Sequence, residues 1–232
     1  LITRINKASI LSLNGRKESK YALHGIHDYK GKFYPQLVRS LINIYMPDKP
    51  GVILDPFCGS STSILEASLL GNRAVGIDIH PLAPLIGNVK VSSVTWSPDQ
   101  FREFVTGVTT IVRDYAEEND YSEFYKGDIE YLSNWYNKKI LNKLFFIYNR
   151  IESVKETRYK NFLLIIFSSL LRDCSHQDPK QIRIYRRKEL LENYPVIEEF
   201  LQKLLEQSNK LISFLYINED KPNKESVVLT YD

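Results

Sequence analysis

One stretch, VILDPFCGSSTSILEASLLGNRAVGIDIHP at residues 52–81, restricts the possible folds more than any other part of the chain. A short apolar run leads into a loop of small residues, and a helical pattern then leads into a second apolar run, RAVGIDI. Short continuous apolar runs indicate strands, and two strands joined through a helix form a parallel βαβ unit of about thirty residues. We therefore predict an α/β fold in which the first strand is covered on both faces.

The helix between these strands has its own start and stop signals. Ser63 and Glu66 have the spacing of a capping box, and Gly71 suits the residue that follows a helix. A further helix is predicted before the first strand, in YPQLVRSLINIYM, where Pro35 fits the first turn. The local signals thus place a helix on either side of the first strand.

Helical patterns dominate from residue 97 to residue 218, and a strand-like run, SVVLTYD, follows them. We expect residues 1–96 to form an N-terminal segment and the first part of an α/β domain. Residues 97–218 would form a helical insertion, and residues 219–232 would return to the sheet. Because the sequence stops soon after this strand, we expect the parallel sheet to be incomplete.

Three kinds of nucleotide-binding loop compete for the residues DPFCGSST. A P-loop needs a lysine that is absent here, and a dinucleotide loop needs GxGxxG, whereas this loop has one glycine, Gly59. Asp55 would also repel a pyrophosphate. S-adenosylmethionine (SAM) has no phosphate and carries an ammonium group that an aspartate attracts, while Gly59 lets the backbone pass close beneath a ligand. The loop therefore favours SAM over a nucleotide phosphate.

Asp78 ends the second predicted strand, nineteen residues after Gly59. An acid at this place can accept hydrogen bonds from ribose hydroxyls. The purely structural alternatives are a helix cap at Asp78 and a turn at Asp55. The combination of strand, loop, helix, strand and acid predicts a SAM site.

DPFCGSSTSILEA resembles the SAM loop of DNA amino-methyltransferases, which methylate adenine N6 or cytosine N4, and GIDIHPLA resembles their next motif. HDYKGKFYPQLVRSLI (residues 27–42) resembles the motif that precedes the loop in members where that motif is N-terminal. The resemblance implies a Rossmann-like SAM-dependent methyltransferase fold with a helical insertion. One departure is Ser61, where the family commonly has a second glycine. Because serine fits easily at a helix start, we expect closer ligand packing there.

The same resemblance implies which residues hold SAM. A lysine suits its carboxylate and aromatic faces suit its sulfonium, and in the third strand an acid contacts its adenine amino group. The candidate cofactor-binding residues are His27, Tyr29, Lys32, Phe33, Tyr34 and Pro35 before the loop, Asp55, Pro56, Phe57, Cys58, Gly59, Ser60, Ser61 and Thr62 in it, Asp78 and Ile79 after it, and Asp232. The alternative for Phe33 and Tyr34 is a place in the core ahead of a helix.

The catalytic motif of these enzymes, [D/N/S]-P-P-[Y/F/W], is absent, since the sequence contains no Pro-Pro pair. In the family this motif holds the exocyclic amine of a base that has left the double helix. We therefore identify no catalytic residue. We expect a C-terminal continuation or a second chain to supply the motif, and this chain alone to be inactive.

The stretch PKQIRIYRRK at residues 179–188 is a second candidate for contact with DNA, because it has five basic residues and no acid. Lysine and arginine bind phosphates, and tyrosine can stack on a base. The candidate nucleic-acid-binding residues are Lys180, Arg183, Tyr185, Arg186, Arg187 and Lys188. The alternative is a solvated connector between two helices.

Composition excludes several classes. Two cysteines, Cys58 and Cys174, are too few for a disulfide scaffold and suit a reducing cytoplasm. Neither follows a proline, so we expect Cys58 to pack beside the cofactor and not to act as a nucleophile. The four histidines have no metal-ligand spacing, and the longest apolar run, at residues 162–171, is about half a membrane span. We predict a cytoplasmic protein with no metal and no membrane contact.

Three functions stay open. The first is a DNA adenine-N6 or cytosine-N4 methyltransferase of a restriction–modification system. The second is an RNA guanine-N2 methyltransferase, although those enzymes usually carry an RNA-binding domain ahead of the fold. The third is a non-catalytic SAM-binding or DNA-binding subunit of a split methyltransferase. A coding sequence that continues past Asp232 into a PP[Y/F/W] strand would discriminate against the third.

Overall fold

The structure is a computed structural model, and it describes residues 21–29, 31–46, 50–178, 180, 183–218 and 226–230. The chain divides into two compact units. The first unit comprises Leu1–Phe101 with Asn209–Asp232, and the second comprises Arg102–Ser208. The domain bounds expected from the sequence, 1–96, 97–218 and 219–232, stay a prediction.

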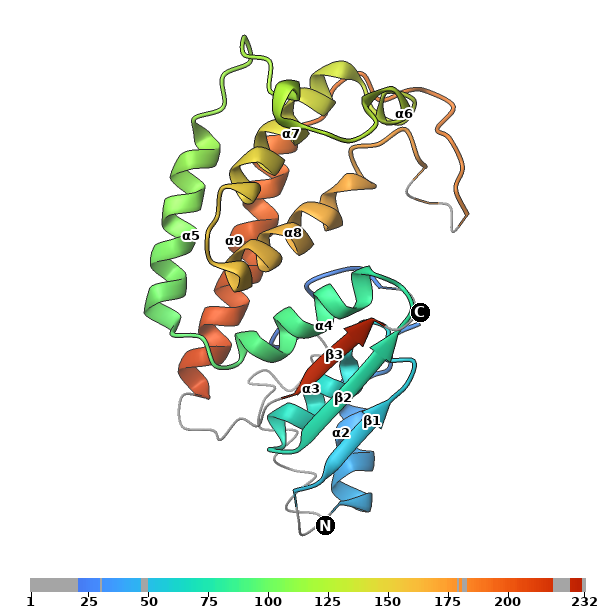
Figure 1. Cartoon of the computed structure of the whole chain (residues 1–232), viewed down its shortest axis with the longest axis vertical. Coiled ribbons are helices and arrows are strands. Elements are labelled where there is room, and N and C mark those ends of the chain that lie inside the picture. Colours follow the sequence, from blue (N-terminus) through green and yellow to red (C-terminus); the bar gives the residue numbers. More distant parts are fainter. Residues whose placement is uncertain are drawn as a thin grey trace. The chain divides into compact units, whose positions relative to one another are not determined.

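A parallel sheet lies at the centre of the first unit. Its strands are β1 (Val52–Asp55), β2 (Arg73–Asp78) and β3 (Val227–Thr230), in the order β1-β2-β3. Val75 of β2 is paired with Leu54 on one side and with Val227 on the other. The carboxyl ends of all three strands therefore meet at one edge (Figure 1). The predicted α/β fold of the Rossmann-like methyltransferase type is confirmed.

Three helices accompany this sheet, namely α2 (Pro35–Tyr45), α3 (Thr62–Leu69) and α4 (Leu82–Ser93). α3 packs on β1 and β2, α4 packs on β2 and β3, and α2 packs on α3. Apolar side chains from all three helices and from β3 form one core, with Val38, Ile42, Ile64, Val91 and Val228 among its buried members. The helices thus cover the same face of the sheet.

The start of α3 differs from the prediction. Its N-cap residue is Ser61, and no side chain caps its first turn. Ser63 lies inside the helix, and the side chain of Glu66 is fully buried. The predicted capping box of Ser63 and Glu66 is wrong because Glu66 binds other side chains in the core. Gly71 follows the helix with a positive φ of 76°, as its predicted place after the helix requires.

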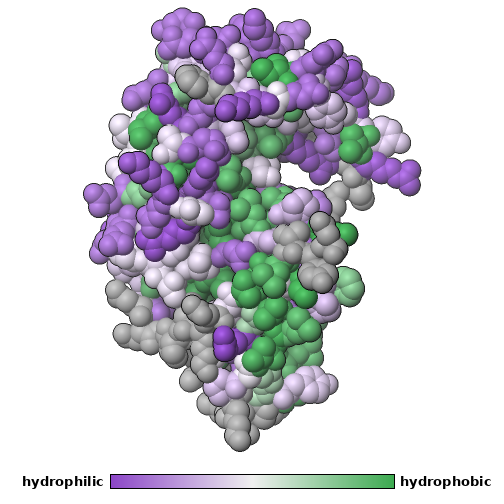
Figure 2. Space-filling view, in the orientation of Figure 1, coloured by the Kyte–Doolittle hydropathy of each residue, from purple (hydrophilic) through white to green (hydrophobic). Residues whose placement is uncertain are grey.

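The other face of the sheet is apolar and exposed. Side chains alternate between the faces of a strand, so the buried Ala74 and Val228 mark the helix-covered face. On the open face Val52 is 67% exposed and Leu54 is 62% exposed, and Leu229 of β3 is exposed too. Figure 2 shows green, apolar residues gathered over the strands. The prediction that β1 is covered on both faces is wrong for the part of the chain that the structure describes.

The second unit is built from helices, and the helices at its two ends begin or end outside its bounds. They are α5 (Pro98–Arg113), the 3-10 turn η1 (Ser122–Phe124), α6 (Ile129–Ser133), α7 (Lys138–Glu152), α8 (Thr157–Leu171) and α9 (Val196–Ile217). α7 packs against α8, η1 and α6. The long apolar run of α8 lies in this core, where Phe162 and Ile166 are fully buried. Within the described ranges, no helix is both long and apolar enough to cross a membrane.

Candidate functional site

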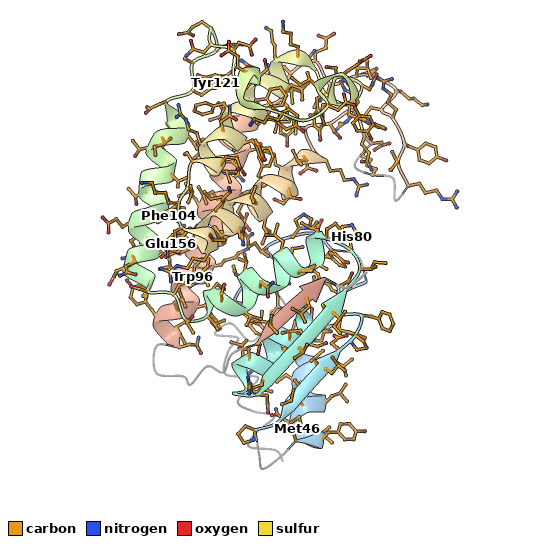
Figure 3. The ribbon with its side chains drawn as sticks, in the orientation of Figure 1. Met46, His80, Trp96, Phe104, Tyr121 and Glu156 are labelled. Carbon is orange, nitrogen blue, oxygen red and sulfur yellow. The ribbon has the colours of Figure 1, made fainter. Side chains whose placement is uncertain are left out.

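The loop between β1 and α3 is joined to the end of β2 by the carboxylate of Asp78. The backbone N–H of Gly59 donates to Asp78 Oδ2 at 2.8 Å, and the N–H of His80 donates to Oδ1 at 2.9 Å. His80, labelled in Figure 3, lies where the chain leaves β2. Asp78 caps no helix, because the N-cap residue of α4 is Pro81. A carboxylate has about four acceptor positions, so Asp78 keeps the capacity to bind two further donors.

Gly59 lies beneath the aromatic ring of Tyr29. Its φ of +48° is in the region that favours glycine, and a Cβ atom here would stand 3.0 Å from Tyr29 Cε1. The Tyr29 ring also meets the His80 ring edge to face, with centroids 6.4 Å apart. The segment before α2, the loop and the end of β2 therefore come together at the carboxyl edge of the sheet.

Ser61 has a strained backbone. Its φ of 61° and ψ of 39° are left-handed, and a non-glycine residue in that region costs about 1 kcal/mol. The expectation that serine fits easily at this helix start is wrong, because the position needs the conformation that glycine adopts freely. Ser61 Oγ lies 3.7 Å from Cys58 Sγ. Both side chains are buried beneath the loop.

Cys58 packs against the sheet. A Cβ atom at Gly76 would fall 2.9 Å from Cys58 Sγ, so the thiol occupies the space that this glycine leaves. Burial raises the pKa of the Cys58 thiol, and the nearby carboxylates of Asp55 and Asp78 raise it further, while the Ser61 hydroxyl lowers it. Because a thiol with a raised pKa is a poor nucleophile, the geometry fits the packing role expected for Cys58.

Several candidate cofactor residues are on the surface. Phe57 is 88% exposed, and Phe33, Tyr34 and Ile79 are exposed as well. The alternative of a core position for Phe33 and Tyr34 is therefore not observed. The backbone N–H of Phe57 donates to Asp55 Oδ1 at 3.2 Å, so Asp55 does form the turn named as its alternative. An exposed aromatic ring beside a nucleotide-type loop remains available for a ligand.

The segment before α2 contributes polar groups. Lys32 Nζ donates to the carbonyl oxygen of His24 at 3.4 Å, and Pro35 is the first residue of α2. Burial lowers the pKa of His27, with Lys90 and Lys32 adding to that effect, so its imidazole is neutral at neutral pH. The remaining candidate, Asp232, lies outside the described residues. The assignment of all these residues to a cofactor stays a prediction.

Glu66 organises the site and was not identified from the sequence. Its buried carboxylate accepts hydrogen bonds from Tyr21 Oη, His24 Nε2 (2.8 Å) and Arg39 Nε (2.5 Å). Burial raises the pKa of Glu66, but the hydrogen bond from His24 and the charge of Arg39 outweigh it, so the net shift is downward. Burial also lowers the pKa of His24, which therefore donates as a neutral imidazole. The Glu66 cluster joins the segment before α2 and α2 itself to the helix after the loop.

One signal in the sequence could have revealed Glu66. In the α3 segment TSILEASL it is the single charged residue among apolar and small ones. A helix without a polar face is buried on most sides, so a lone acid in it needs buried partners.

The basic connector is partly structural. Arg187 donates to three backbone carbonyl groups, those of Asp173 at 2.8 Å, Ser175 at 3.0 Å and Gln177 at 3.2 Å. Arg186 donates to the carbonyl oxygen of Asn134 at 3.1 Å and forms an antiparallel bridge with Gln177. The exposed candidates in the connector are Lys180, Arg183, Tyr185, Arg186 and Lys188. A nucleic-acid role stays a prediction, and Arg187 holds the connector together.

No metal site is evident in the part of the chain that the structure describes. Nowhere among those residues do three His, Cys, Asp or Glu side chains lie close enough to share an ion.

Comparisons with known proteins agree with the resemblance drawn from the motifs. Residues 7–83 match the family model of N6 and N4 enzymes described as DNA methylase. The chain is 27% identical over 194 residues to the Type II methyltransferase M.MvaI of Kocuria varians, which is 80% of this chain and 42% of that protein. It is 32% identical over 127 residues to the Type II methyltransferase M.MjaII of Methanocaldococcus jannaschii, which is 55% of this chain and 23% of that protein.

A shorter match is to a protein whose name specifies tRNA, and not DNA, as the substrate. Over 51 residues, 22% of this chain, the sequence is 43% identical to 15% of a tRNA (guanine(10)-N2)-dimethyltransferase of Methanothermobacter thermautotrophicus. No solved structure matches the chain. The chain spans less than half the length of the two Type II methyltransferases. The predicted resemblance is confirmed: residues 7–83 match the family model of the N6 and N4 DNA methylases, and the relatives named above include Type II DNA methyltransferases.

Proposed function

We propose that this chain is the SAM-binding part of a DNA methyltransferase that acts on the exocyclic amine of adenine or cytosine in a restriction–modification system. The observation that carries the proposal is the hydrogen bond from Gly59 N–H to Asp78 at 2.8 Å. It holds the carboxylate of Asp78, which would accept from ribose hydroxyls, beside the loop, where a Cβ atom at Gly59 would stand 3.0 Å from Tyr29 Cε1. This geometry lies within the residues that match the DNA methylase family.

The groups around the loop fit SAM. The hydroxyl of Ser60 is buried and has no hydrogen-bond partner among the described residues, so it is free to bind a ligand. When bound, SAM supplies an electrophilic methyl group on its sulfonium. Asp78 would accept from the ribose, Lys32 would face the carboxylate, and exposed aromatic rings such as Phe57 would lie against the cofactor. The remaining step, which is to hold the target amine, is the role of the [D/N/S]-P-P-[Y/F/W] motif, and this motif is absent from the sequence.

The open face of the sheet supports a continuation of the chain or a second chain that carries the catalytic motif. Val52, Leu54 and Leu229 leave apolar side chains in water, and burying such a side chain fully contributes about 1.5–3 kcal/mol. Exposed apolar patches of this kind mark places where further structure packs. The Type II relatives are more than twice as long as the part that this chain matches.

Transfer of labelled methyl groups from SAM to mixed-sequence DNA tests the function. We expect no transfer by the purified 232-residue chain, because its sequence lacks the PP[Y/F/W] motif that would hold the amine in place. Transfer should appear when a polypeptide with the PP[Y/F/W] motif is added or fused. The matched control is the same polypeptide with alanine in place of both prolines. Clear turnover by the 232-residue chain alone would contradict the proposal.

The short match to a tRNA guanine-N2 dimethyltransferase favours a second candidate function, an RNA methyltransferase. The same assay with tRNA as the acceptor discriminates between the two. A non-catalytic subunit is the third candidate, and it would bind SAM or DNA without methyl transfer in any combination.

Both cysteines are free and buried, which agrees with the proposed cytoplasmic location.

We expect the exposed cations of the connector to contact DNA phosphates. Replacing Arg183 and Lys188 together by alanine should weaken DNA binding and lower the slope of log affinity against log salt by up to about two. Arg187 is left intact, because removing its three bonds to carbonyl groups would loosen the connector itself. The control replaces Lys139 and Lys155, two exposed lysines elsewhere in the second unit. Equal affinities and slopes in both double variants would show that the connector is only solvated.

A further inference from the structure

A buried lysine supports the loop from inside the core. Lys90 of α4 is 1% exposed, and its Nζ donates to the carbonyl oxygen of Ser60 at 2.6 Å. Ser60 lies between Gly59, which binds Asp78, and Ser61, which begins the turn into α3. The ammonium group of Lys90 therefore holds the middle of the loop, although Lys90 lies thirty residues away in the sequence.

The ionisable groups around Lys90 include two acids, but neither of them forms a bond to it. The ionisable groups on the elements around it are His24, His27 and Lys32 of the segment before α2, Glu66 of α3, Arg73 and Asp78 of β2, and Cys58 of the loop. Glu66 is bound by Arg39 and His24, and both oxygens of Asp78 accept from backbone groups. Among the residues that the structure describes, no carboxylate bonds to Lys90. The positive charge of the buried amine is thus uncompensated in the free protein.

Burial and the charge of Lys32 both act against that positive charge. Desolvation lowers the pKa of Lys90 to about 7, and Lys32 adds to the effect. Lys90 in turn lowers the pKa of His24 and His27. Close to the same place, the buried hydroxyl of Ser60 has no partner within the described residues. The amines of Lys90 and Lys32 and the unused hydroxyl of Ser60 are complementary to an anionic group of a ligand.

We infer that Lys90 is a positioning residue of the proposed SAM site: it holds the loop through the Ser60 carbonyl group, and it takes up a proton from water when the carboxylate of SAM binds. The inference rests on the proposed function. An anion beside the two amines stabilises the charged form of Lys90, so binding and protonation favour each other. SAM affinity is then greatest below about pH 7 and falls by up to about tenfold per pH unit above it.

Calorimetry in two buffers of different ionisation enthalpy measures the protons taken up on binding. At about pH 8 the 232-residue chain should take up as much as about 0.9 proton per SAM at Lys90, since a group with a pKa of about 7 is mostly neutral there. 5′-Methylthioadenosine, which lacks the methionine carboxylate and ammonium, should bind without this uptake. K90M should bind SAM about tenfold more weakly near pH 6 and lose the uptake due to Lys90. K90R, which stays charged, should retain affinity at high pH.

The ammonium group of SAM can also take up a proton on binding, and that uptake persists in K90M. The difference in proton uptake between the unaltered chain and K90M therefore measures Lys90 alone. Circular dichroism and Trp96 fluorescence establish that each variant is folded. Should K90M fail to fold, K90R still decides, because an arginine is already protonated at pH 8 and the uptake due to Lys90 should be lost in it as well. Equal proton uptake for both ligands, or for the unaltered chain and K90M, would overturn the inference about Lys90 alone. Absence of SAM binding by the unaltered chain at any pH would instead reject the proposed function, and this inference with it.

Discussion

Replacing Glu66 by alanine is expected to lower the free energy of unfolding of the first unit by about 3–5 kcal/mol. The substitution removes the acceptor of three hydrogen bonds and leaves the guanidinium group of Arg39 buried without a counter-charge. Breaking a buried ion pair from one side is costly because the remaining charge cannot reach water. Since domains are stable by only about 5–15 kcal/mol, the first unit would lose a large share of its stability.

Urea unfolding followed by tryptophan fluorescence measures this loss. The sequence has two tryptophans, of which Trp96 is buried in the first unit and Trp135 belongs to the second. In a Trp135→Phe background the signal reports on the first unit alone. Asp28→Ala is the matched control, because this acid is exposed in the segment that also carries His24. A change below about 1 kcal/mol for Glu66→Ala, similar to the control, would show that the cluster does not stabilise the unit.

Replacing Asp78 by alanine is expected to weaken SAM binding by about tenfold to a hundredfold. A hydrogen bond to a charged group contributes about 1.5–3 kcal/mol, and Asp78 would accept from the ribose as well as from the loop. The substitution also releases the backbone N–H groups of Gly59 and His80, so the loop loses its connection to β2. Asp78→Asn keeps one acceptor oxygen and should give an intermediate loss.

Calorimetry with SAM measures the effect, and Arg73→Ala is the control at the opposite, exposed end of the same strand. The control should leave affinity unchanged. If Asp78→Ala and Arg73→Ala bind SAM equally well, Asp78 is not part of the site.

Local patterns predict β1, α3 and β2 well, because each depends on residues within the same thirty-residue stretch. The open face of β1 could not be predicted in this way. Val52 and Leu54 have the sequence pattern of a buried strand, and whether they are covered depends on which other elements lie against the sheet. Pairing of β3 with β2 is likewise a long-range event, and only the apolar run at residues 226–230 hinted at it.

The site could be predicted where the spacing of residues along the chain determines their positions. It could not be predicted where the position of a side chain depends on partners from other elements. The nineteen residues from Gly59 to Asp78 place both at the carboxyl edge of the sheet, and they are hydrogen-bonded there. Glu66 has the spacing of a capping box, but three partners from residues 21–39 hold it in the core. The sequence pattern predicts Arg187 to be a DNA-binding cation, whereas the backbone carbonyl groups of Asp173 and Ser175 hold its side chain in place.

The strained Ser61 restricts how this sequence can evolve. A Cβ atom at Gly87 of α4 would meet Ser61 Oγ at 2.3 Å, Ser61 Cβ at 3.0 Å and Val228 Cγ2 at 2.6 Å. Alanine at position 87 would therefore force the side chains at positions 61 and 228 to move, and it is easier to accommodate when position 61 is glycine and the side chain at 228 turns away or shrinks. A glycine at 61 would also remove the backbone strain. Because a Cβ atom at position 87 would contact the side chains at positions 61 and 228, we expect substitutions at these three positions to be correlated across related sequences, with the small residue moving from the helix to the loop.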